Sequence, residues 1–421
     1  MAKRKRRQRY NGPDLTEHVD LNPGDNFEIT LGEINDAGDT VTEIDGAPVV
    51  VSGGLPGEVV IAEVQKKFPE RIAAKVAQVL KPAAERVEPE CKYFLECSGC
   101  QWQHVSYGHQ LQLKRERVQR EIDKYETLAG LEVDLTVESE KRLRYRNHGR
   151  FTIGKYEDAG QVGYKNAVTR QFVRIEECLL MDQKVNDTIA LVQDKMEGQT
   201  QMSIRVGVNT DSMLVQPKML IPGLDLATGV QHYEEEVRGS CFTVAASSFF
   251  QVNTGQLSRA VDEVRELLDL QGSEVMVDAY CGVGVFAVLM SPYVKKVVGI
   301  EESASAIEDA GQNMNGVTNV EFIEGKTEDV MADWPLVDDV DVLLLDPPRV
   351  GCHPDVLDSV KKLKPKKVLM VSCEPAAMGR DLDLLCQGGM YKLEILRPVD
   401  MFPQTRHVET ISMLTLQESQ D

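Results

Sequence analysis

The sequence of 421 residues has no long run of apolar side chains. A membrane-spanning helix needs about 18 consecutive apolar residues, and no window approaches that length. The basic segment MAKRKRRQRY runs into NGPDLTEH and lacks the apolar region of a secretory signal. We therefore expect a cytoplasmic protein with no membrane partner. We also expect a monomer, built from two to four domains on length alone.

The nine cysteines lack the pattern of a small disulfide framework. Cys91, Cys97 and Cys100 have the spacing C-x5-C-x2-C, and Cys178 is a distant fourth candidate. Four thiolates bind either structural zinc or an iron–sulfur cluster. Zinc sites usually pair two C-x2-C motifs, and only one is present, which favours iron–sulfur without deciding the question.

The net charge of −20 gives no overall attraction for nucleic acid. Lysine and arginine residues are nevertheless clustered in two segments of the chain. Residues 1–10 are rich in lysine and arginine and contain no acid, and the segment KRLRYRNHGR holds a second cluster. Such basic tracks suit RNA, although a solubilising tail and a solvated strand face would explain them equally well. The candidate RNA contacts in the second cluster are Arg142, Arg144, Arg146 and Arg150.

Changes of pattern along the chain predict a multidomain α/β protein. Residues 1–14 are expected to form a disordered basic arm, and 15–82, with strand-like pieces separated by Gly and Pro, a small β-barrel. Residues 83–245 are expected to form a central mixed α+β domain that holds the cysteines and the basic cluster. A helix over 104–126 has an apolar face that can pack on the C-terminal domain, 246–421.

From about residue 255, strands alternate with helices, which is the signature of a doubly wound parallel sheet. The last two predicted strands, within 391–403 and 407–416, have no helix between them, so we expect an antiparallel final pair. Ligands of such sheets bind beyond the carboxyl ends of the strands. The polar residues at those ends are therefore the candidates for the functional site.

The segment DAYCGVGVF places Asp278 at a predicted strand end, with Gly282 and Gly284 in the turn that opens a helix. Glycines allow a ligand to approach the backbone closely, but the third glycine of a dinucleotide fingerprint is lacking. Glu301 follows about 20 residues later, where an acid can bind ribose hydroxyls. Glu328 or Asp329 could lie near an adenine or form a solvated turn.

Candidate catalytic side chains lie at the ends of three further predicted strands. Asp346 precedes two prolines and Arg349, Cys373 ends the run VLMVSC, and Glu409 begins the run ETISML. Taken alone, Cys373 could be a buried structural cysteine and Glu409 a loop acid. Asp346 followed by two prolines resembles the base-binding loop of nucleobase methyltransferases, but the aromatic residue typical of amine-methylating enzymes is lacking, because Arg349 follows instead.

Together, the motifs DAYCGVGVF, DPPR, SCEPAAMGRD and MFPQTRHVE, with FFQVN at 249–253 and the cysteine spacing, resemble the RNA uracil-5-methyltransferase family. Within it, the chain is most similar to enzymes that carry a TRAM domain and act on 23S ribosomal RNA. Ala377 and Gln404 replace the threonine and histidine frequent in the family. The resemblance implies an OB-like TRAM barrel, a central domain with an iron–sulfur site and a class I, Rossmann-like methyltransferase domain.

The resemblance also implies roles for single residues. It assigns S-adenosylmethionine (SAM) binding to Gln251, Asp278, Tyr280, Gly282, Gly284, Glu301 and Asp346. It implies a 4Fe–4S cluster on Cys91, Cys97, Cys100 and Cys178, with zinc the lesser alternative. It makes Cys373 the nucleophile, Glu409 the base and Asp346 the uracil-binding residue, with Arg349 as a further RNA contact.

The chemistry requires such residues independently of the family. C5 of uracil is a poor nucleophile until a thiolate adds at C6, which is covalent catalysis, and a carboxylate must later remove the C5 proton. We therefore expect methylation of a ribosomal RNA uridine. The alternatives are the same reaction on a transfer RNA T-loop uridine, methylation of a base amine, or a non-catalytic RNA-binding or ribosome-assembly factor.

Overall fold

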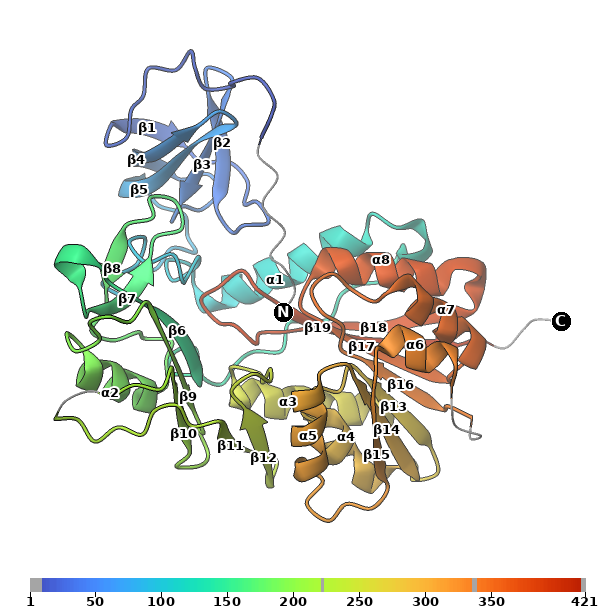
Figure 1. Ribbon diagram of the computed structural model, residues 1–421. Helices are drawn as coiled ribbons and strands as arrows, with labels where there is room; N and C mark the ends of the chain where they lie inside the picture. The colour runs from blue at the N-terminus through green and yellow to red at the C-terminus, as the bar shows by residue number, and fades with distance from the viewer. Residues whose placement is uncertain (1–9, 221–222, 335–338, 418–421) are drawn as a thin grey trace. The chain divides into compact units, whose positions relative to one another are not determined.

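The computed structural model describes residues 10–220, 223–334 and 339–417 (Figure 1). The basic stretch at residues 1–9 lies outside the described residues. The chain divides into two compact units. Of the described residues, unit 1 comprises 10–110, 163–175 and 404–406, and unit 2 comprises 111–162, those within 176–403, and 407–417. No helix of the described residues is long and apolar enough to cross a membrane. The predicted domain limits stay a prediction.

Unit 1 contains a five-stranded sheet with the order β1-β4-β5-β3-β2. Alternating burial along β3 indicates one face packed on a core and one facing outward. The Thr42 hydroxyl donates to the carbonyl oxygen of Thr30 at 3.1 Å, so the two end strands of this order touch. The strands are β1 (Asn26–Thr30), β2 (Thr40–Ile44), β3 (Ala47–Ser52), β4 (Val59–Phe68) and β5 (Arg71–Lys81). Unit 1 also holds most of the hairpin of β7 (Val162–Lys165) and β8 (Phe172–Arg174).

Helix α1 (Tyr107–Ile122) forms where the sequence predicts a helix over 104–126. Its Val118 and Ile122 are fully buried in a core cluster with strands of unit 2. A single helical turn, η1 (Glu126–Leu128), follows.

The first part of unit 2 consists of short strands and one helix. Asp182 caps the helix by accepting a hydrogen bond from the backbone N–H of Lys184 at 2.9 Å. Strand β6 pairs antiparallel with β9, which pairs with β10, while β11 and β12 form a separate hairpin. These elements are β6 (His148–Ile153), η2 (Tyr156–Asp158), α2 (Gln183–Val192), β9 (Gln201–Val206), β10 (Met213–Gln216), β11 (His232–Val237) and β12 (Ser240–Ala245).

The second part of unit 2 is a seven-stranded sheet with the order β15-β14-β13-β16-β17-β19-β18. The five strands from β15 to β17 are parallel, whereas β19 is antiparallel to both β17 and β18. The predicted strand–helix alternation and antiparallel final pair are therefore confirmed. The strands are β13 (Val275–Ala279), β14 (Lys296–Glu301), β15 (Val320–Glu324), β16 (Val342–Leu345), β17 (Lys367–Ser372), β18 (Tyr391–Val399) and β19 (Glu409–Leu416).

Helices cover both faces of this sheet (Figure 1). Along β16, Leu343 and Leu345 join the core under α1, α6, α7 and α8, while Val342 and Leu344 join the core under α3, α4 and α5. Burial on both faces explains why the central strands are continuously apolar. The helices are α3 (Thr254–Leu268), α4 (Val285–Met290), α5 (Ala304–Asn313), α6 (Thr327–Ala332), α7 (Pro354–Leu363) and α8 (Pro375–Cys386), with single turns η3 (Ser291–Tyr293) and η4 (Gln387–Gly389).

Helix α6 was not predicted. Its six residues begin with the polar Thr327, Glu328 and Asp329, which resemble a solvated turn. Tertiary packing decides the outcome, because Met331 on this helix is buried in the core.

Candidate active site

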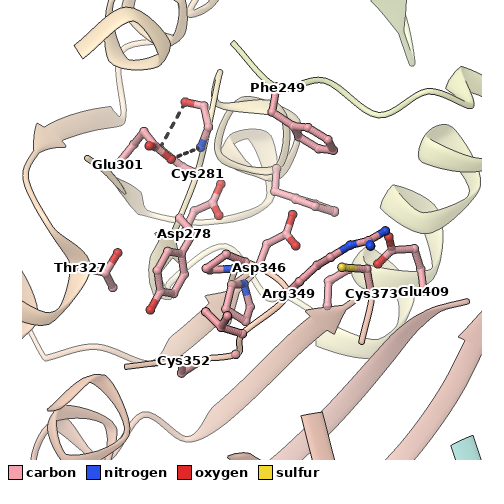
Figure 2. Close-up of a pocket in the computed structure, with 18 of the residues that line it drawn as sticks. Phe249, Asp278, Cys281, Glu301, Thr327, Asp346, Arg349, Cys352, Cys373 and Glu409 are labelled. Carbon is pink, nitrogen blue, oxygen red and sulfur yellow. Dashed lines mark hydrogen bonds between the residues drawn. The ribbon is translucent and has the colours of Figure 1, made fainter. Parts of the chain in front are cut away.

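A cavity of about 950 Å³ lies at the carboxyl end of the parallel strands of unit 2. The ends of β13, β14, β16 and β17, the start of β19 and the segment before α3 all line it (Figure 2). Most site residues proposed from the sequence meet here: Gln251, Asp278, Tyr280, Gly282, Glu301, Asp346, Arg349, Cys373 and Glu409. Gly284 adjoins the cavity through its neighbours Val283 and Val285.

The turn between β13 and α4 follows from backbone conformations that glycine favours. Gly282 has φ +54°, and Gly284 caps α4 with φ +83°. A Cβ at Gly284 would lie 2.8 Å from the ring of Phe322, whereas one at Gly282 would meet nothing within 4 Å. The non-glycine Tyr280 also has a positive φ of +67°. Such strain persists only where surrounding structure holds it, and it gathers at functional sites.

Two carboxylates hold this turn. Asp278 accepts a hydrogen bond from the Ala287 N–H at 2.9 Å through Oδ2. Glu301 accepts from the N–H groups of Gly282 at 3.1 Å and Ser303 at 2.9 Å. Burial, and then the negative charge of Asp346, hold the pKa of Asp278 well above its usual range.

Two buried acceptors in the cavity wall have no hydrogen-bond partner among the described residues. They are Oδ1 of Asp278 and Oε1 of Gln251. Buried polar atoms are nearly always paired in native proteins. A ligand with ammonium or hydroxyl groups would satisfy both oxygens, so this end of the cavity fits the amino acid and ribose parts of SAM.

Cys373 lies directly after β17, close to Arg349 and Glu409 (Figure 2). The thiol is half-buried. Burial, with the charge of Glu409, raises its pKa to about 11, although the positive charge and hydrogen bond of Arg349 act in the opposite direction. The charge and hydrogen bond of Arg349 therefore favour the thiolate form of Cys373.

Two acids flank this thiol. Asp346 follows β16, and burial raises its pKa to about 7. Glu409, the first residue of β19, is 5% exposed, and burial together with the charge of Asp346 holds its pKa well above the usual range. Burial therefore raises the proton affinity of both carboxyl groups above that of a solvent-exposed acid, which favours proton transfer to them.

Phe249 was not singled out from the sequence. It is 69% exposed, unusual for a large aromatic side chain, and it lines the cavity from the segment before α3 (Figure 2). The signal was the doubled aromatic of FFQVN, whose second member, Phe250, is buried at 5% exposure. Phe249 can supply the stacking surface that the DPPR loop lacks.

The remaining predicted RNA contacts do not line the cavity. Arg142 and Arg150 are exposed, and Arg150 lies on β6. Arg144 forms an ion pair with Glu177 at 2.7 Å, and Arg146 is half-buried. Burial and the positive charges of Arg205, Arg146 and Arg150 lower the pKa of His148 to about 3. Three arginine charges thus act on His148, after burial, in the same direction.

The four cysteines proposed as ligands are half-buried: Cys91, Cys97, Cys100 and Cys178. Two hydrogen bonds stabilise the loop that carries the first three cysteines. The Cys97 N–H donates to the carbonyl oxygen of Tyr93 at 2.8 Å, and the Gln103 amide donates to Cys100 Sγ at 3.2 Å. Within residues 10–220, 223–334 and 339–417, no group of three or more His, Cys, Asp or Glu side chains is arranged to hold a metal.

The similarity of this chain to known proteins extends beyond the motifs. Residues 231–417 match the family model of tRNA (uracil-5-)-methyltransferases. The chain is 32% identical over 449 residues to an uncharacterised RNA methyltransferase of Listeria innocua, an alignment that covers 93% of this chain and 98% of that protein. It is 29% identical over 454 residues to an uncharacterised RNA methyltransferase of Halalkalibacterium halodurans, covering 95% and 99%.

The fold is also found in a solved structure. The crystal structure of Pyrococcus abyssi tRNA (uracil-54, C5)-methyltransferase in complex with S-adenosyl-L-homocysteine superposes with a TM-score of 0.74 at 24% identity, covering 92% of this chain and 100% of that one. This likeness shows a SAM-dependent methyltransferase fold. With the sequence matches, it follows that the chain belongs to the SAM-dependent RNA (uracil-5-)-methyltransferase family.

Proposed function

We propose that this enzyme methylates C5 of a uridine in RNA through a covalent bond between Cys373 and C6 of the base. The observation that carries the proposal is the convergence of Cys373, Asp346, Glu409 and Arg349 in one cavity. A thiol, a hydrogen-bond acceptor, a base and a cation are the groups that this chemistry needs.

The cofactor end of the cavity is formed by Gln251, Asp278, Tyr280, Gly282 and Glu301. The unpartnered oxygens of Asp278 and Gln251 would accept from the cofactor's polar groups, and Glu301 is placed to bind ribose hydroxyls. Bound SAM supplies an electrophilic methyl group on a sulfonium.

The first step activates the ring. The Cys373 thiolate forms a bond to C6, and the C5–C6 electron pair shifts so that C5 becomes nucleophilic. Arg349 favours the thiolate by its charge and hydrogen bond. Ionised Asp346 accepts the uracil N3–H and orients the ring, and with a pKa of about 7 it is substantially ionised at neutral pH.

The last step releases the product. After methyl transfer, C5 carries both a methyl group and a hydrogen. Glu409 removes that proton, the C5–C6 double bond re-forms, and the C6–S bond breaks, which returns the thiolate to Cys373. A positioned base contributes roughly 10²- to 10⁴-fold.

The target base must leave its stack, at a cost of a few kcal/mol. Exposed Phe249 could recover part of this, since stacking on an aromatic side chain contributes about 1–3 kcal/mol per base. We assign further RNA contacts to the TRAM-like sheet of unit 1 and to Arg142, Arg144, Arg146 and Arg150.

Covalent trapping tests the mechanism. In RNA that contains 5-fluorouridine, fluorine cannot leave as a proton does, so wild-type protein with SAM should form a lasting protein–RNA adduct. Cys373→Ala should form none, and Cys386→Ala, a buried cysteine outside the cavity, should behave as wild type. Methylation that survives Cys373→Ala would instead indicate amine chemistry, and no turnover of uridine RNA by wild type would favour a non-catalytic factor.

We infer ribosomal RNA, 23S in particular, as the substrate, on the motif resemblance alone. Transfer RNA is a second candidate, since the matching family model and the Pyrococcus abyssi enzyme are both named for transfer RNA. Mapping 5-methyluridine in both RNA pools from cells with and without this protein distinguishes them. The pool that loses the modification is the substrate.

We also propose, from cysteine spacing and the resemblance, that Cys91, Cys97, Cys100 and Cys178 bind a 4Fe–4S cluster, with zinc the alternative. No catalytic step uses it. Metal and sulfide analysis of anaerobically purified protein should give about four irons and four sulfides per chain, and Cys97→Ser should lose them. One zinc without sulfide would overturn the cluster.

A further inference from the structure

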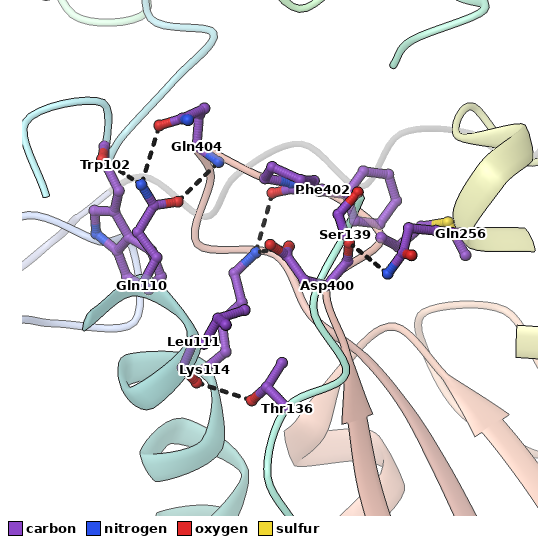
Figure 3. Close-up of polar contacts among 12 residues, drawn as sticks. Trp102, Gln110, Leu111, Lys114, Thr136, Ser139, Gln256, Asp400, Phe402 and Gln404 are labelled. Atoms are coloured by element: carbon purple, nitrogen blue, oxygen red, sulfur yellow. Dashed lines mark hydrogen bonds and ion pairs between the residues drawn. The ribbon is translucent and has the colours of Figure 1, made fainter. Parts of the chain in front are cut away.

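Lys114 and Asp400 form a fully buried ion pair outside the residues that line the cavity (Figure 3). Both side chains are 0% exposed. Lys114 lies on α1, and Asp400 directly follows β18. The Lys114 ammonium also donates to the carbonyl oxygen of Phe402 at 3.0 Å. One side chain therefore holds two points of the segment 400–402.

Stability alone does not explain this pair. Each buried ion loses several kcal/mol of hydration, and replacing such a pair with apolar residues is often neutral or stabilising. Burial lowers the Lys114 pKa, and the charge of Asp400 opposes that shift. A specific geometric role is a physical reason for keeping a pair that apolar packing could replace.

The held segment forms part of the cavity wall. Met401 and Phe402 line the cavity. Val399, the residue before Asp400, is the register partner of Glu409 across the β18–β19 pair. A displacement of residues 399–402 would therefore reach the proposed base through the strand pairing.

The same segment is bonded to the cofactor side of the cavity. The Gln256 amide donates to the carbonyl oxygen of Asp400 at 3.1 Å (Figure 3). The Asn253 amide donates to that of Met401 at 3.2 Å. Asn253 caps α3 and lies two residues after Gln251. The segment thus connects α1, the Gln251 stretch and the strand that begins with Glu409.

We propose that Lys114 and Asp400 are positioning residues, which fix the 399–402 segment so that Glu409 reaches the C5 proton of the methylated adduct. This inference rests on the proposed covalent mechanism. It predicts a specific defect: the adduct forms normally, but proton removal from C5, and with it breakage of the C6–S bond, becomes slow.

The test uses the full chain with Lys114→Met combined with Asp400→Val, which removes both charges at similar volume. We expect a melting temperature near that of wild type and a SAM Kd within about two-fold. Displacements of about 1 Å cost up to about 10²-fold, so kcat should fall by about 10- to 10²-fold. Methylated covalent adduct should accumulate on ordinary uridine RNA, as in Glu409→Gln.

The matched control is Arg397→Met combined with Glu263→Leu. Arg397 lies on β18 and Glu263 on α3, with an Nη1–Oε2 distance of 2.6 Å between them, but neither residue lines the cavity. It should show no adduct. Asp400→Glu, which keeps both charges but lengthens the side chain, gives the same test if the double variant fails to fold.

The outcomes distinguish failure of the proposed positioning role from failure of the proposed covalent mechanism. A folded Lys114→Met/Asp400→Val protein, or Asp400→Glu protein, with wild-type kcat and no adduct overturns the positioning role, as does equal accumulation in the Arg397 control. Failure of wild-type protein to trap 5-fluorouridine RNA overturns the covalent mechanism itself.

Discussion

At the scale of single residues, the site is a set of acidic groups whose pKa values are raised by burial. The pKa values of Asp346, Cys373 and Glu409 are all raised, each chiefly by burial. Proteins often accept such costs in a functional site, where stability is exchanged for activity. Removing one of these groups should therefore stabilise the empty enzyme while it stops the reaction.

The substitution Asp346→Asn tests whether this buried carboxyl group lowers stability while it supports activity. The folded carboxyl keeps its proton up to about pH 7, whereas the unfolded one loses it near pH 3.9. The folded state binds more protons between these values, so this group makes stability fall as pH rises through that window. Asparagine does not ionise. We expect Asp346→Asn to raise the melting temperature more at pH 8 than at pH 5, while methylation falls by at least about 10²-fold.

The control lies at the other end of the same strand. Asp341 precedes β16 and pairs with Lys366 at 2.7 Å, and this ion pair, with a backbone hydrogen bond, outweighs burial and lowers its pKa. Asp341→Asn should therefore lower the melting temperature at both pH values and leave activity in place. An equal gain for Asp346→Asn at pH 5 and pH 8 would contradict the raised pKa.

At the scale of elements, the turn from β13 into α4 forms part of the proposed cofactor end of the cavity. It needs left-handed backbone at Gly284 and close approach to the Phe322 ring. The two glycines predicted from the sequence, Gly282 and Gly284, therefore contribute to the turn in different ways. Gly284 permits packing, whereas Gly282 presents an N–H to Glu301.

We predict that Gly284→Ala costs more stability than Gly282→Ala. Both alanines carry the left-handed penalty of about 1–2 kcal/mol, but only the first meets a neighbour at 2.8 Å. Thermal melts should rank wild type above Gly282→Ala and Gly282→Ala above Gly284→Ala, and calorimetric titration should show the weakest SAM binding for Gly284→Ala. The reverse order would show that the turn relaxes at Phe322.

At the scale of the whole molecule, the proposed SAM site lies entirely within unit 2. A ligand stabilises the unit that binds it through mass action. The stabilisation should therefore be visible in unit 2 before it is visible in unit 1.

SAM at about 100 times its Kd should add about 2.7 kcal/mol to the stability of unit 2. Hydrogen exchange should slow in β13 and β14, while β4 of unit 1 should change less. Asp278→Asn should reduce the effect, because its unpartnered Oδ1 is a proposed cofactor contact. Equal protection of β4 and β13 would show that the two units respond as one.

Three features could be predicted from the residues alone: the alternating strands and helices, the antiparallel final pair, and the strand ends that carry Asp278, Glu301, Asp346, Cys373 and Glu409. These follow from apolar periodicity and from glycines, which are local properties. Other features depend on contacts between distant parts of the chain. Helix α6 forms because Met331 is buried, Phe249 is exposed while Phe250 is buried, and Lys114 meets Asp400 across 286 residues. These features result from packing between residues far apart in the sequence, and a local sequence pattern therefore does not predict them.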